Sequence, residues 1–206
     1  VSGEAVKVTV GSSPKQETFY IPKSVLQSSS AFLRAALKPE WAGDTCRPID
    51  LTDENPTAFG IYAQWLYSGR FLFKLKGAAD LSDNWITLAQ TYVLGEKLMD
   101  TTFQNEVIDA VFAYRTQAGV CIPTYRTIKI AYEGTCAGSP MRKYLVDTYV
   151  WSVHISWTFK NIVEDTSVEF LQEVLEALVK IRPTNKRGEQ APWTKAAELY
   201  YTKDTK

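Results

Sequence analysis

The chain has 206 residues, of which 45% are hydrophobic and 13% aromatic, and its 23 Lys and Arg residues balance its 23 Asp and Glu residues. Such a chain can bury a sizeable core, and its zero net charge excludes the overall positive field on which non-specific nucleic-acid binders depend. It lacks any run of about 18 apolar residues, so no membrane span is expected, and an odd number of widely spaced cysteines favours an intracellular location, cytoplasmic or nuclear.

The first part of the chain predicts a hairpin followed by two short helices. Residues 6–10 alternate apolar and polar side chains, the period of a half-buried strand, and a Gly-Ser-Ser-Pro turn leads into a partner strand at 17–21. A first helix is predicted to begin at Pro22. A serine-rich break at 28–30 separates it from a second short helix at 31–37.

A third strand and a capped helix are predicted next. The strand ends at residues 49–51. Asp53 or Asn55 can cap the following helix, because Pro56 suits the first helical position and apolar residues recur after it at helical spacing. Gly69 ends this helix.

Two longer helices complete the predicted core. Apolar residues at helical spacing predict one helix over 81–99, with Ser82 or Asp83 as its cap, and another over 103–112. Together with the earlier elements, this order predicts an α+β fold in which a small three-stranded sheet is capped by a cluster of helices.

The rest of the chain is predicted to be helical. A short helix covers 128–132, and a longer one over 140–153 begins with Ser139 as its cap. Asp165 or Thr166 starts a last helix that runs to residue 181. We interpret this region as a helical extension packed on the core.

One pentapeptide offers an enzymatic alternative. Residues 134–138 read Gly-Thr-Cys-Ala-Gly, the spacing of a hydrolase nucleophile elbow, which would make Cys136 a nucleophile. Such an elbow needs a preceding strand and a neighbouring histidine, whereas the preceding residues look helical and His154 is the one histidine in the sequence. A single histidine without paired cysteines also falls short of a metal site. The favoured interpretation is a glycine-rich turn, and no cofactor is expected.

The C-terminal tail offers a second alternative. Residues 180–206 hold seven basic and three acidic residues, and Lys186, Arg187 and Trp193 could contact nucleic acid. A solvated terminus is the simpler interpretation, because no nucleic-acid module precedes the tail.

Several motifs in fixed order resemble the BTB/POZ domain, in the version common in filamentous fungi. The segment 19–70 runs strand, helix, serine-rich break, helix, strand, helix, and ends in Gln-Trp-Leu-Tyr-Ser-Gly, close to the family's Trp-Leu-Tyr-x-Gly. The resemblance continues through residues 92–100, 103–110, 132–135 and 138–142.

BTB/POZ domains bind other proteins, so the resemblance implies a non-enzymatic interaction module. Many members form dimers through their first strand and first helix, and some bind a cullin-type ubiquitin ligase scaffold. The family histidine is replaced here by Pro22, and Glu40 lies one residue later than the family's scaffold-binding acid. The other tryptophans, Trp151 among them, are mostly predicted in the core, but Trp41 follows Glu40 in a loop. The candidate partner or dimer surface comprises Val8, Pro22, Val25, Leu26, Phe32, Leu37, Glu40 and Trp41.

The predicted organisation is therefore a BTB/POZ domain at 6–118, a helical extension at 119–182 and a basic tail at 183–206. Proteins are the expected partners, either a second copy, a different BTB protein or a cullin-type scaffold. No small-molecule substrate and no membrane contact are expected, and nucleic acid remains the alternative carried by the tail.

Overall fold

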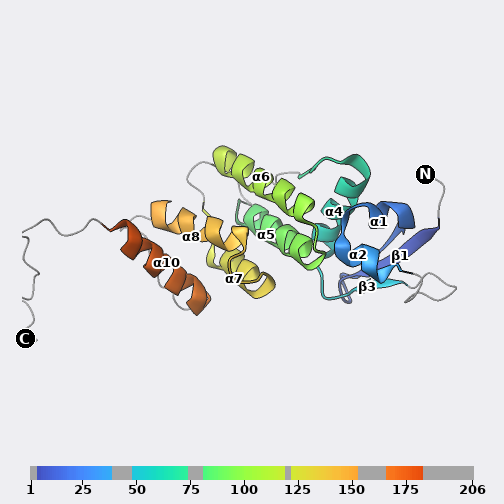
Figure 1. Ribbon diagram of the computed structural model, residues 1–206, viewed down its shortest axis with the longest axis horizontal. Helices are drawn as coiled ribbons and strands as arrows, with labels where there is room; N and C mark the ends of the chain where they lie inside the picture. Colours follow the sequence, from blue (N-terminus) through green and yellow to red (C-terminus); the bar gives the residue numbers. More distant parts are fainter. Residues whose placement is uncertain (1–3, 39–47, 74–80, 119–121, 153–165, 183–206) are drawn as a thin grey trace, which may run out of the picture.

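The described part of the chain is an elongated α+β structure in which a small sheet lies at one end and helix α10 (Val168–Ile181) at the other (Figure 1). Within the described part of the chain there are eight helices and one three-stranded sheet, which confirms the predicted fold class. The computed structural model describes residues 4–38, 48–73, 81–118, 122–152 and 166–182.

The sheet is centred on β1 (Ala5–Val10). Strand β2 (Glu17–Pro22) pairs with it antiparallel, as the predicted hairpin requires, and β3 (Ile49–Leu51) pairs with it parallel. Alternation along β1 turns its three valines inward, where they are fully buried against the helices. Because β3 pairs with the central strand, the helices that follow β3 in the chain begin beside the middle of the sheet.

The two short helices follow directly from β2. Helix α1 (Lys23–Ser29) begins after Pro22, and α2 (Ala31–Ala36) is capped by Ser30, whose hydroxyl accepts a hydrogen bond from the Leu33 N–H at 3.0 Å. Both helices were predicted, including the serine-rich break between them.

Helix α4 (Pro56–Ser68) starts and stops as its sequence indicates. Of the two predicted caps, Asn55 is the one used, because its side chain accepts a hydrogen bond from the Ala58 N–H at 3.1 Å. Gly69 ends the helix with a φ of 64°, in the left-handed region that favours glycine.

Helices α5 (Leu81–Lys97) and α6 (Thr101–Ala118) pack as an antiparallel pair in the middle of the molecule, between the sheet and α10 (Figure 1). Ser82 and Asp83 both lie within α5 and therefore do not cap it. Trp85 and Leu88 of α5 and Phe103 of α6 are buried in the core that these helices share with the sheet.

The extension consists of α7 (Tyr125–Gly134), α8 (Pro140–Ser152) and α10 (Val168–Ile181). It packs along α5 and joins the same hydrophobic core, to which it contributes Ile128, Leu145 and Phe170 among others. Gly134 lets α7 approach α5 closely, because a Cβ atom there would lie 2.4 Å from a methyl group of Val93. The extension is thus continuous with the core.

Two expectations for the extension need correction. Ser167 caps α10, where its hydroxyl accepts a hydrogen bond from the Glu169 N–H at 3.2 Å, in place of the predicted Asp165 or Thr166. Trp151 is exposed and not in the core. It follows the buried Tyr149 by two positions, which places it on the opposite face of α8.

Candidate partner-binding surface

Three residues of the predicted partner surface belong to the core. Val8 points inward from the central strand, Leu26 is the buried residue of α1, and Leu37 closes α2 against the same core. Their side chains are therefore not available to a partner in this monomer. The sequence pattern marked them as apolar but did not separate the inner face of the sheet and helices from the outer one.

The remaining predicted residues differ in exposure. Pro22 and Val25 are half-buried at the start of α1, and Val25 packs on the core. Phe32 of α2 is 36% exposed and so presents part of its ring to solvent. Glu40 and Trp41 lie outside the described residues.

Met99 was predicted to lie within the helix over 81–99, but α5 ends at Lys97 and the Met99 side chain is exposed. It follows α5 with a φ of 54° and a side chain that is 64% exposed. Its N–H donates to Glu96 O and the Asp100 N–H donates to Gly95 O, both at 3.0 Å. These two bonds form a Schellman motif, in which the left-handed position is usually glycine.

The backbone of α2 meets this turn directly. The Phe32 N–H donates to Leu98 O at 3.4 Å, and the Ser30 hydroxyl donates to the same carbonyl. Phe32 and Met99 therefore lie on neighbouring backbone segments from elements far apart in sequence, at the end of α5 next to α2 (Figure 1). We call these two residues the Phe32–Met99 surface.

Asp100 anchors this surface from below. Its carboxylate is buried and accepts hydrogen bonds from the Tyr62 hydroxyl at 3.0 Å, from the Phe103 N–H at 3.0 Å and from the Ser29 hydroxyl. Burial, and secondly the charge of Asp100, raise the pKa of Tyr62 far above its ordinary value, so Tyr62 stays a donor. One carboxylate thus ties α1, α4 and α6 together next to the turn that carries Met99.

The Cys136 site does not have the features of a nucleophile elbow. A helix, α7, precedes it where the elbow needs a strand. Hydrogen bonding to Glu96 and the charge of that carboxylate raise the pKa of the exposed Cys136 thiol, which disfavours the thiolate. The backbone N–H of Cys136 and the hydroxyl of Ser139 also donate to Glu96, at 2.7 and 3.0 Å, so Glu96 holds the turn in place. His154 lies outside the described residues.

Arg142 is the second buried polar centre. Its guanidinium donates to Tyr132 O at 2.8 Å and to Thr135 Oγ1 at 3.0 Å, and it pairs with Glu169 at 2.7 Å. It also lies over the Tyr132 ring at 4.5 Å. The donors of Arg142 are therefore used to join α7, α8 and α10, and Tyr132 both accepts a hydrogen bond at its carbonyl and makes a cation–π contact through its ring.

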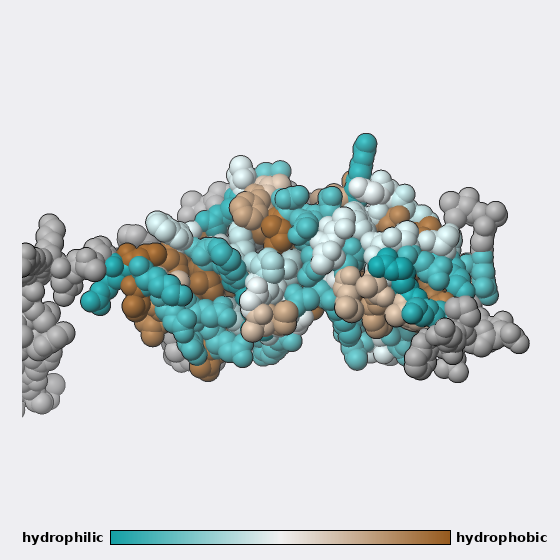
Figure 2. Space-filling view, viewed as in Figure 1, coloured by the Kyte–Doolittle hydropathy of each residue, from teal (hydrophilic) through white to brown (hydrophobic). Residues whose placement is uncertain are grey.

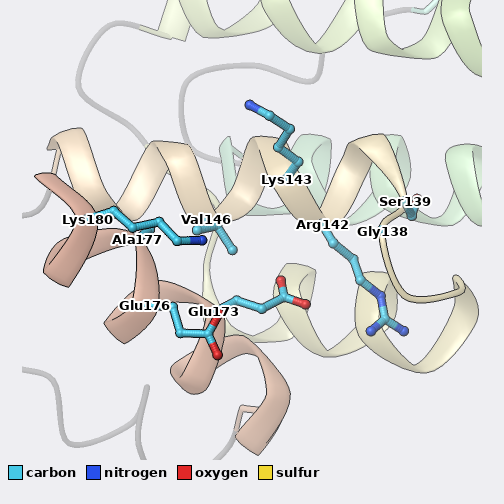
Figure 3. Close-up of a pocket in the computed structure, with 9 residues that line it drawn as sticks. All are labelled: Gly138, Ser139, Arg142, Lys143, Val146, Glu173, Glu176, Ala177 and Lys180. Carbon is cyan, nitrogen blue, oxygen red and sulfur yellow. The ribbon is translucent and has the colours of Figure 1, made fainter.

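A shallow cavity of about 230 Å³ lies beside Arg142, between α8 and α10. Figure 3 shows that Arg142 points toward the loop before α8 while Lys143 points away from α10. Charges of both signs surround the cavity without converging on one point. The residues that line it are Gly138, Ser139, Arg142, Lys143, Val146, Glu173, Glu176, Ala177 and Lys180.

The described residues show neither a metal-binding group nor a membrane-spanning helix. They contain no group of three or more His, Cys, Asp or Glu side chains placed to hold a metal ion. Among the helices in this part of the chain, none combines the length and the apolar character that a membrane span needs. The basic tail and Cys46 and Cys121 fall outside the ranges that the structure describes.

A scan against protein-family models gave no match, and no curated protein matches the chain. The described residues define only a structural class, an α+β protein with a three-stranded sheet, a helical cluster and one continuous hydrophobic core.

Proposed function

We propose that the chain is a protein-interaction module of the BTB/POZ type that acts without catalysis. The order of strands and helices from β1 to α6 is the order that the resemblance implies, and it supports this assignment. The observation that carries the proposal is the Phe32–Met99 surface, where two large apolar side chains are exposed on backbone segments that hydrogen-bond to each other.

The strained backbone of Met99 strengthens the argument. A residue other than glycine in the left-handed conformation is less stable by roughly 1–2 kcal/mol. A methionine at this position gains little from packing, since most of its side chain faces solvent. Exposed, adaptable methionine side chains suit protein-binding surfaces. We therefore assign Met99 a role in binding a partner.

The partner proposed is another folded protein, and a cullin-type ubiquitin ligase scaffold is the specific candidate that the resemblance suggests. An apolar anchor that a partner buries at the centre of an interface typically contributes 2 kcal/mol or more. Replacing Phe32 or Met99 by a charged residue should thus weaken binding by about 30-fold or more.

The test is affinity capture with the full chain and three variants, Phe32→Glu, Met99→Glu and Leu72→Glu. Leu72 is 51% exposed and serves as the matched control, because it lies beside Asn84 and Thr87 near the start of α5, whereas Met99 follows the end of that helix. Proteins retained by wild type and Leu72→Glu but lost from both other variants would support the proposal, and a purified cullin scaffold is tested the same way. Capture unchanged by both variants, with normal thermal unfolding, would refute it.

The absence of catalysis is tested at Cys136. Because the raised thiol pKa opposes thiolate formation, Cys136→Ala should leave any ester hydrolysis by the preparation unchanged. A loss of turnover in that variant would contradict the non-enzymatic assignment.

A further inference from the structure

Helix α10 is attached to the rest of the chain by few of its own residues. Of its 14 residues Phe170 is the buried one, and Leu171, Val174 and Ala177 are partly buried against the core. Figure 2 shows hydrophobic residues gathered over α10, at the end of the molecule opposite the sheet. The apolar residues of α10 that stay exposed are Val168, Leu175, Leu178, Val179 and Ile181. Because segments with few buried contacts open locally before the core does, we expect α10 to detach more readily than α5 or α6.

The one buried side chain of α10 contacts two tyrosine rings. The ring of Phe170 meets the Tyr132 ring at 5.5 Å and the Tyr149 ring at 5.1 Å between centroids, edge-on in both cases. Tyr132 belongs to α7 and Tyr149 to α8. The Tyr149 hydroxyl donates to Pro123 O at 2.7 Å, so this ring is held by a residue outside α10. The two tyrosines thus form an aromatic contact site for which α10 supplies a phenylalanine.

Two acidic residues of α10 bind donors of the same two helices. Arg142 Nη1 donates to Glu169 at 2.7 Å, and the Tyr132 hydroxyl donates to Glu173. Burial, followed by the hydrogen bond to Glu173, raises the pKa of Tyr132 far above its ordinary value, so the hydroxyl stays a donor. Glu169 and Glu173 are four positions apart and therefore lie on one side of the helix. We call Tyr132, Arg142 and Tyr149 the α10 docking site.

The docking site is held in place by α7, α8 and the turn between them. Arg142 Nε donates to Thr135 Oγ1 at 3.0 Å, and its Nη2 donates to Tyr132 O at 2.8 Å. Nη1 is the nitrogen that binds the α10 carboxylate. The side chain of Arg142 is 7% exposed, whereas that of Glu169 is 67% exposed. A largely exposed carboxylate exchanges an ion pair for water at little cost, so Glu169 can leave while Arg142 stays in position.

The fit of α10 against α8 is incomplete. The cavity of about 230 Å³ between the two helices is lined in part by Val146 of α8 and Ala177 of α10, whose side chains are drawn in Figure 3. Protein interiors normally leave few voids larger than a water molecule. A helix with a larger apolar side chain at the position of Ala177 would fill this space and would therefore bind the docking site better than α10 does.

We propose that α10 is a displaceable helix that occupies, in the free chain, a docking site for a helix of another protein with the same pattern, Glu-Phe-x-x-Glu. The first Glu of that pattern binds Arg142, the Phe contacts both tyrosine rings, and the second Glu accepts from the Tyr132 hydroxyl. An amphipathic helix laid against an apolar site is a recurring mode of protein recognition. In this role α10 is an autoinhibitory contact, at the end of the molecule opposite the sheet (Figure 1).

The occupant is assigned to another protein because a second copy has no advantage. The α10 of a second copy makes the same contacts as the α10 already present, which is tethered to the site and so competes at a high effective concentration. A helix of different sequence that also fills the cavity beside Ala177 gains a contact that α10 lacks.

Binding of a fluorescein-labelled peptide of residues 166–182 to the full chain, followed by fluorescence anisotropy, tests the inference. This peptide is the probe because the structure shows how its sequence fits the site. Wild type should bind it weakly, since its own α10 competes. Phe170→Ala, which loosens that helix, should bind it at least about tenfold more tightly. Glu169→Gln alters a largely exposed side chain and should bind it severalfold more tightly, and Leu72→Glu should bind it like wild type.

Variant peptides test which side chains the site recognises. Against the Phe170→Ala chain, peptides carrying Phe170→Ala or Glu169→Lys should bind at least about tenfold more weakly than the unaltered peptide. An Ala177→Leu peptide should bind severalfold more tightly, and weaker binding would contradict the incomplete fit of α10. In hydrogen–deuterium exchange of wild type, the amides of α10 should exchange at least about tenfold faster than those of α5.

Three results would overturn the inference. The first is a peptide that binds neither the Phe170→Ala nor the Glu169→Gln chain, or that binds equally well without its phenylalanine and first glutamate. In the second, the amides of α10 exchange together with those of α5, which would make α10 a fixed part of the core. In the third, wild type forms dimers that the added peptide dissociates, which would make a second copy the occupant. None of these measurements involves the Phe32–Met99 surface, so their outcome is independent of the proposed function.

Discussion

Replacing Met99 by glycine should make the protein more stable and a weaker binder. The left-handed backbone at Met99 destabilises a non-glycine residue by about 1–2 kcal/mol, and glycine removes that strain. Glycine loses about 0.5–1 kcal/mol more conformational entropy on folding, so the net gain is about 0.5–1 kcal/mol. Loss of the methionine side chain subtracts little from this gain in the free energy of unfolding, since the residue is 64% exposed.

The assay is urea unfolding of wild type, Met99→Gly and Met99→Ala. Alanine removes the side chain but keeps the strain, so Met99→Ala should unfold close to wild type while Met99→Gly unfolds at a higher urea concentration. In a thermal scan the midpoint of Met99→Gly should rise by about 1–4 °C. Both variants should capture less partner. A Met99→Gly chain that is less stable than wild type would show that the side chain packs in the fold, and would refute this reasoning.

Three further predictions concern the buried polar centres. Asp100→Ala should lower the free energy of unfolding by about 2–4 kcal/mol, measured by urea unfolding, because the buried Tyr62 hydroxyl and Phe103 N–H lose the acceptor of their hydrogen bonds. A loss below about 1 kcal/mol would contradict the anchoring role of Asp100. Arg142→Lys should lower it by about 2–4 kcal/mol in the same assay, since an ammonium cannot reproduce the planar set of donors, and an unchanged midpoint would contradict this. Burial raises the pKa of Tyr149 in the folded chain above that of the unfolded chain. As the pH rises above about 10, the unfolded chain therefore releases the Tyr149 proton first, and the stability that Tyr149 contributes in full below about pH 10 is lost. Tyr149→Phe should therefore lose stability less steeply above that pH, by up to about 1.4 kcal/mol per pH unit, and equal slopes would contradict the assignment.

Local signals in the sequence were sufficient for most of the elements. The cap at Asn55, the proline at the first position of α4 and the glycine at its end each act through neighbouring backbone groups, so the sequence alone predicts the bounds of that helix. The alternation in β1 likewise predicts its strand. The parallel pairing of β3 with β1 depends on residues about 40 positions apart, and no local pattern predicts it.

The candidate surface was predicted less well, because exposure depends on tertiary packing. Val8, Leu26 and Leu37 look like Phe32 in an apolar pattern, but only packing decides which of them stays exposed. Met99 was missed because a Schellman motif is usually recognised by glycine, and the sequence carries methionine at that position. Asp100 caps the start of α6 by accepting a hydrogen bond from the Phe103 N–H. It was missed because it directly follows the end of α5, which the sequence pattern did not reveal.

Hydrogen–deuterium exchange of the full chain, with and without a captured partner, tests the central claim most directly. The account predicts slower exchange of backbone amides in residues 29–37 and 96–103, which carry and support the Phe32–Met99 surface. Protection confined to other segments, or no protection in these two at saturating partner, would contradict it.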